Sequence, residues 1–124
     1  MSEINVDGKE RIVYIRDWHR TPMGVVVYKL DGGTALAAVA SQNPMDSWDR
    51  QRGLSIARGR LNSGKSDRNI CVDLGEEKNS FECMLLVLLA VANPENERMC
   101  GLSRVTQLLL LDQIDTLREA REMR

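Results

Sequence analysis

Several features that mark common protein classes are scarce in this sequence. It has one histidine, His19, and three cysteines, none in a C-x-x-C pair or at a metal-ligand spacing from the histidine. We therefore expect no metal site and no cofactor. The odd, widely spaced set of Cys71, Cys83 and Cys100 is typical of a reducing compartment. We expect the three thiols to be small buried hydrophobic groups.

Targeting signals and long apolar segments are missing as well. The N-terminal segment MSEINVDGKER lacks the basic and then apolar layout of a signal peptide. The longest apolar run, residues 83–92, is too short to span a bilayer. We therefore expect a cytoplasmic protein that has no membrane partner.

The net charge is small but unevenly distributed. With a formal charge of −1, no field of the whole molecule attracts long nucleic acid or acidic lipid. Residues 50–68, however, carry +5, and the remainder carries −6. The charged residues of this segment are Arg50, Arg52, Arg58, Arg60, Lys65 and Arg68 against Asp67. A local positive patch on an acidic body indicates a confined anion site.

The first part of the chain has the pattern of an antiparallel β-meander. Its 124 residues fit a single domain, 1–124. β-Branched and aromatic residues predict strands at 11–17 and 24–30, and a third strand at 34–41, although its alanines also permit a helix. Asp31-Gly32-Gly33 predicts a tight hairpin turn between the last two, because glycine tolerates positive φ.

The second part of the chain is predicted to be mainly helical. A basic helix runs from Asp46 to Leu61, with Asp46 or Ser47 as its N-cap and with Leu54, Ala57 and Leu61 on its buried side. A possible fourth strand follows at 69–74. Asn79 and Glu82 resemble a capping box before an apolar helix at 81–92, and a last helix starts near residue 102. The predicted class is therefore α+β.

The two C-terminal helices contain more apolar residues than one buried stripe needs. The helix at 81–92 is apolar on nearly all sides, and the last helix contains four consecutive leucines at 108–111. A helix of this kind needs cover all round. We therefore expect a homo-oligomer, in which a second subunit supplies part of that cover.

The segment GRLNSGKS, residues 59–66, satisfies the pattern G-x-x-x-x-G-K-[ST] of phosphate-binding loops. In such a loop a strand precedes the glycines and a helix follows, so that helix N–H groups face the phosphate. Here the predicted order is reversed. We therefore rank a small phosphate-loop nucleotidase below the alternatives.

Catalysis by a nucleophile has little support in the sequence. A serine or cysteine nucleophile needs a neighbouring base, and the only histidine, His19, lies at a predicted turn. We expect His19 to be an ordinary turn residue. We therefore expect no catalytic residues, and a protein that is not an enzyme.

The basic helix is the main candidate for a ligand site. Arg52 and Arg60 lie on one side of it and Arg58 on another, and a guanidinium group matches phosphate oxygens well. Trp48 could offer a stacking face to a base, and Asn43 lies just before the helix. The alternative is that these arginines are solvated or pair with Asp46 and Asp49. Charge alone leaves both interpretations open.

The segment SQNPMDSWDRQRGLSIARGRL, residues 41–61, resembles a motif of small phage proteins, N-P-x-D-x-[aromatic]-x-[basic]-x-x-G-x-x-I-A-x-G-R. It is similar to the phage anti-Thoeris sponge proteins, the first-described Thoeris anti-defence family. Chain length and the order of strands before helices also suit that family. The motif positions that match are Asn43, Asp46, Trp48, Gly53, Gly59 and Arg60. The chain departs from the motif at Leu54-Ser55, where a basic residue is expected.

The resemblance implies a specific function. Proteins of that family sequester cyclic ADP-ribose-type immune signals without turnover, in the cytoplasm of the infected bacterial host. They also hold cyclic trinucleotides at separate sites, in a hexamer built from dimers. Arg60 would contact a phosphate, Phe81 would stack on adenine, and Arg104 would be a cation near Phe81. The alternative function is a phage-encoded protein inhibitor, such as an anti-CRISPR, that acts through the basic patch.

Overall fold

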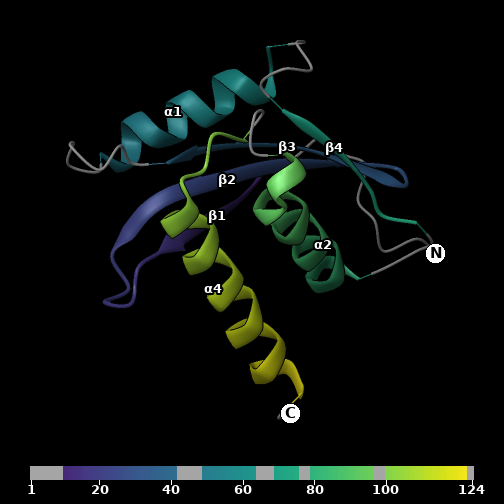
Figure 1. Cartoon of the computed structure of the whole chain (residues 1–124). Coiled ribbons are helices and arrows are strands. Elements are labelled where there is room, and N and C mark those ends of the chain that lie inside the picture. Colours follow the sequence, from purple (N-terminus) through teal and green to yellow (C-terminus); the bar gives the residue numbers. More distant parts are fainter. Residues whose placement is uncertain (1–9, 42–48, 64–68, 76–78, 97–99, 123–124) are drawn as a thin grey trace.

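Three layers make up the fold. The computed structural model describes residues 10–41, 49–63, 69–75, 79–96 and 100–122. A four-stranded sheet forms the middle layer, with helix α1 on one face and helices α2 and α4 on the other (Figure 1). This confirms the predicted α+β class, with an N-terminal meander and C-terminal helices. No helix in the described ranges is both long and apolar enough to cross a membrane.

The sheet is antiparallel, and its strands follow the order of the chain. They are β1 (Glu10–Arg16), β2 (Pro22–Asp31), β3 (Thr34–Ser41) and β4 (Ile70–Asp73). Asp31 pairs with Thr34 across the predicted hairpin turn, where Gly32 adopts a φ of 63°. The fourth strand is confirmed, but it pairs only with the first half of β3, from Thr34 to Ala37.

Both faces of the sheet are buried, and each contributes to its own core. On one face, Val25, Val27, Ala38 and Ala40 pack against α1. On the other face, a larger cluster joins the alternate residues of the same strands to α2 and α4. Strand residues alternate between the two faces, so β2 and β3 are buried almost throughout.

Helix α1 (Arg50–Leu61) begins later than predicted. The carboxylate of Asp49 accepts hydrogen bonds from the backbone N–H groups of Gln51 and Arg52, at 3.0 and 3.1 Å. Asp49 therefore provides the N-cap, and the expectation that Asp46 or Ser47 would do so is wrong. Both of those residues lie outside the described ranges. On α1, Ala57 and Leu61 are buried as predicted, whereas Leu54 is only half-buried and Gly53 is buried beside them.

Helix α2 (Ser80–Ala92) starts with the predicted capping interaction. The side-chain oxygen of Asn79 accepts from Glu82 N at 2.8 Å, and its Nδ2 donates to Glu82 Oε1 at 2.9 Å. Every residue from Phe81 to Ala92 is buried or half-buried. The chain itself therefore covers most of α2, and a short 3-10 helix η1 (Pro94–Asn96) follows it.

Helix α4 (Arg104–Glu122) lies beside α2 and runs past the edge strand β1 (Figure 1). The side-chain amide of Gln113 accepts from Arg16 N at 3.1 Å and donates to the Tyr14 carbonyl at 2.9 Å. It thus takes the place of a neighbouring strand at that edge. The apolar surplus predicted for both C-terminal helices is found mainly on the outer side of α4.

Candidate functional site

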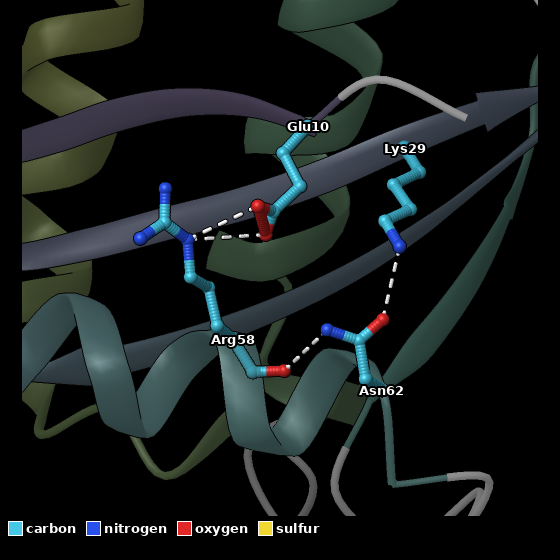
Figure 2. A network of polar contacts seen from close by, with 4 residues as sticks. All are labelled: Glu10, Lys29, Arg58 and Asn62. Atoms are coloured by element: carbon cyan, nitrogen blue, oxygen red, sulfur yellow. Dashed lines mark hydrogen bonds and ion pairs between the residues drawn. The ribbon is translucent and has the colours of Figure 1, made fainter. Parts of the chain in front are cut away.

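Two arginines of the basic helix attach α1 to the edge strand β1. Arg58 Nε lies 3.0 Å from Glu10 Oε1 (Figure 2). The Arg50 guanidinium lies over the Tyr14 ring, 4.8 Å from its centre. Residues 50 and 58 are two turns apart on the helix, and residues 10 and 14 face the same side of the strand. The charges of Arg50 and Arg58 are therefore engaged within the chain.

Arg60 points toward a different strand. Its Nη1 donates to the carbonyl oxygen of Val39 at 2.7 Å, and its own carbonyl accepts from Asn69 Nδ2 at 3.0 Å. Strand β4 pairs with β3 only as far as Ala37, so the Arg60 side chain supplies a donor beyond the end of β4. This structural role was not expected for the residue that the motif assigns to a phosphate.

The predicted site residues of the basic helix that the structure describes do not converge on one point. Arg58 contacts β1 and Arg60 contacts β3, and β2 separates these two strands. Arg52 is exposed, and its side chain has no hydrogen bond or ion pair within the described residues. Asn43 and Trp48 lie outside those residues. A site at the start of α1 therefore stays a prediction from the motif.

The helix and the strand that flank residues 59–66 do not have the order of a phosphate-binding loop. Helix α1 ends at Leu61, and strand β4 begins at Ile70. The helix thus precedes the loop and the strand follows it, the reverse of the order that directs helix N–H groups at a phosphate. Gly64, Lys65 and Ser66 themselves lie outside the described residues.

A second candidate lies where the start of α2 meets the end of α4. Two adjoining clefts, of about 450 and 550 Å³, share Phe81 and Arg121 in their walls. The other described residues in the walls are Glu82, Leu85, Leu117, Arg118 and Ala120. The Arg121 guanidinium lies 4.7 Å from the centre of the Phe81 ring, and its Nη2 lies 4.0 Å from Glu82 Oε1. This region combines an aromatic face with two guanidinium groups.

The structure does not bring Arg104 to Phe81. Phe81 contacts Arg121, which lies 17 residues beyond Arg104 in the same helix. At 1.5 Å per residue the two arginines are about 25 Å apart along the axis. Among the described residues, the cations beside Phe81 are Arg118 and Arg121, neither of which was predicted as a site residue from the sequence. These two arginines lie near Phe81 because α2 and α4 pack antiparallel, which places the end of α4 beside the start of α2.

A further cleft, of about 390 Å³, lies between the β1–β2 loop and α4. Its walls include Trp18, which is 74% exposed, together with Arg16 and Arg20. The loop is held by the Asp17 carboxylate, which accepts from the backbone N–H groups of His19 and Thr21. Trp18 was not predicted as a site residue, although a tryptophan beside a predicted turn is a visible signal in the sequence.

Among the described residues, the histidine and the three cysteines lie in different environments. His19 is exposed in the β1–β2 turn, as predicted. Cys83 and Cys100 are buried as predicted, but Cys71 is exposed on β4, where successive residues alternate between the two faces. Burial raises the pKa of Cys100 to about 11, so this thiol is a poor nucleophile. Within the described residues no three His, Cys, Asp or Glu side chains are placed to hold a metal ion.

Comparisons with known proteins provide no assignment. No protein-family model, no curated protein and no solved structure matches this chain.

Proposed function

We propose that this chain is a phage-encoded sponge that binds a cyclic nucleotide immune signal, of the cyclic ADP-ribose type, without turnover. The proposed place of action is the cytoplasm of the infected host. The observation that carries the proposal is the pair of clefts at Phe81, where an aromatic ring and two arginines lie between α2 and α4. The motif at residues 41–61 is the independent support from the sequence.

The residues around Phe81 suit the parts of such a ligand. Adenine can stack on the half-buried Phe81 ring, and base–aromatic stacking contributes about 1–3 kcal/mol. The guanidinium groups of Arg118 and Arg121 suit the oxygens of a pyrophosphate. Because Arg121 already lies over the ring, a base takes the other face or displaces the guanidinium. Leu85 and Leu117 supply apolar walls.

Binding without turnover agrees with the chemistry of these clefts. Among the described residues, their walls contain one carboxylate, Glu82, and no histidine, cysteine, serine or lysine. General acid–base cleavage of a glycosidic or phosphodiester bond usually needs a positioned donor and a positioned acceptor of protons. A single half-exposed carboxylate that is paired with Arg121 supplies only one of these two groups.

The test is calorimetric titration of the full chain with cyclic ADP-ribose isomers and with cyclic di- and trinucleotides. Phe81→Leu keeps an apolar group and removes the stacking face, so we expect affinity to fall by tenfold or more, as the loss of about 1.4 kcal/mol does. Arg121→Gln is expected to act in the same direction. The matched control is Arg20→Gln, because Arg20 lines the separate cleft between the β1–β2 loop and α4 and does not line the clefts at Phe81.

Unchanged affinity in Phe81→Leu, for every nucleotide that the original chain binds, would reject this site. No binding of any of these ligands by the original chain would reject the function. The alternative, a protein inhibitor acting through the basic patch, loses support because Arg58 and Arg60 make contacts within the chain. It predicts co-purification with a host protein and no nucleotide binding.

A further inference from the structure

The outer side of α4 exposes apolar side chains at the centre of its solvent-facing surface. Val105, Leu108 and Leu111 are 58%, 53% and 39% exposed, and they are three of the six large hydrophobic side chains exposed in the described residues. The buried side of the helix is formed by Leu109, Leu110 and Ile114. Exposed aliphatic groups gathered on one helix indicate a surface that another molecule covers.

Charged residues stand at both ends of this apolar surface. Arg104, Leu108, Leu111 and Asp115 follow one another at spacings of four, three and four, so they form one line along the helix. Arg104 and Asp115 are both exposed, and neither side chain has an ion pair or hydrogen bond within the described residues. The line therefore runs from a cation through two leucines to an anion.

A line with this order is complementary to itself in one orientation. If two copies of α4 lie antiparallel about a two-fold axis between Leu108 and Leu111, each Arg104 stands opposite an Asp115, and each Leu108 opposite a Leu111. A parallel pair would instead place Arg104 beside Arg104 and Asp115 beside Asp115, which repel each other. Two-fold pairing through one shared surface is the commonest mode of self-association, and charge pairs at the ends of an apolar seam set its orientation.

We propose that two copies of this chain associate through the outer side of α4, as an antiparallel pair in which Leu108 packs on the partner's Leu111 and Arg104 forms an ion pair with the partner's Asp115. The proposal does not depend on nucleotide binding, because its residues precede Arg118 and Arg121 along the helix and none of them lines the Phe81 clefts. It gives Arg104 a role at the subunit interface.

The experiment is light scattering coupled to size exclusion, on the full chain at micromolar concentration. The original chain is expected to have at least twice the monomer mass of 14.0 kDa. Leu108→Asp is expected to be folded, by circular dichroism, with its mass reduced to the monomer or with its dissociation constant raised at least a hundredfold. Ile56→Asp, at a side chain that is 40% exposed on α1, is the matched control and should keep the original mass.

Charge reversal tests the orientation and does not touch the leucines. Arg104→Asp alone and Asp115→Arg alone are each expected to weaken association at least tenfold, and the double variant is expected to restore it. Arg52→Asp, at an exposed arginine of α1, controls for the change in net charge. A monomeric original chain, an unchanged mass in Leu108→Asp, or no recovery in the double variant would each overturn the proposal.

Discussion

Replacing Arg60 by alanine separates a structural role of this arginine from a ligand-binding role. In the structure, the side chain donates a 2.7 Å hydrogen bond to the carbonyl of Val39, a residue that is 1% exposed. The bond connects α1 to the part of β3 that β4 does not reach. The motif, in contrast, assigns Arg60 to a phosphate. The two roles predict different results in the absence of any nucleotide.

The expected loss of stability follows from this geometry. A hydrogen bond from a charged donor contributes about 1.5–3 kcal/mol, and a buried carbonyl that loses its donor costs a similar amount. Arg60→Ala should therefore lower the free energy of unfolding by about 2 kcal/mol without ligand. With a urea slope of about 2 kcal/mol per molar, the midpoint falls by about 1 M.

Arg52→Ala is the matched control in the urea experiment. Arg52 is on the same helix and exposed, and it has no described side-chain partner, so its removal should change stability by less than about 0.5 kcal/mol. If Arg60→Ala and Arg52→Ala unfold at the same urea concentration, the hydrogen bond from Arg60 to the Val39 carbonyl does not stabilise the fold, contrary to this prediction.

Two further predictions concern α1 and the core. Gly59→Ala should raise the free energy of unfolding by about 0.5–1 kcal/mol, because glycine is unfavourable inside a helix and an added Cβ would meet no atom within 4 Å; a destabilised variant in urea unfolding would contradict this. Burial raises the pKa of Cys100 from 9.0 to about 11, so the folded state keeps the thiol proton up to a higher pH than the unfolded state does. The stability that Cys100 contributes is thus fully present below pH 9 and is lost as pH rises toward 11. If the free energy of unfolding of Cys100→Ala falls between pH 9 and 11 as much as that of the original chain, Cys100 is not the group responsible.

The sequence was a good guide to the strands and helices, because their signals are local. Alternating β-branched residues, the Asp31–Gly33 turn and the Asn79–Glu82 capping pair each act over a few residues, and all lie where the sequence predicted them. The cap of α1 was misplaced because several acceptors stand in succession before the helix. Only the geometry shows that Asp49 bonds to the first N–H groups.

The candidate sites were harder to predict because they depend on contacts between distant segments. Nothing in the composition of α1 shows that Arg58 meets Glu10, 48 residues earlier, or that Arg60 meets Val39. The packing of α2 against α4 likewise brings Arg121 to Phe81 and keeps Arg104 away. A run of arginines predicts a ligand site only when the rest of the chain leaves their guanidinium groups available.

The proposed function requires that the chain hold a cyclic nucleotide and release it unchanged. The most direct measurement is to incubate the protein with cyclic ADP-ribose isomers, remove unbound ligand by gel filtration, denature the complex by heat, and analyse the released material by mass spectrometry. We predict that one isomer is retained in a fixed stoichiometric ratio and recovered intact. Recovery of a converted product, or retention of none of the isomers, would rule out the proposed function.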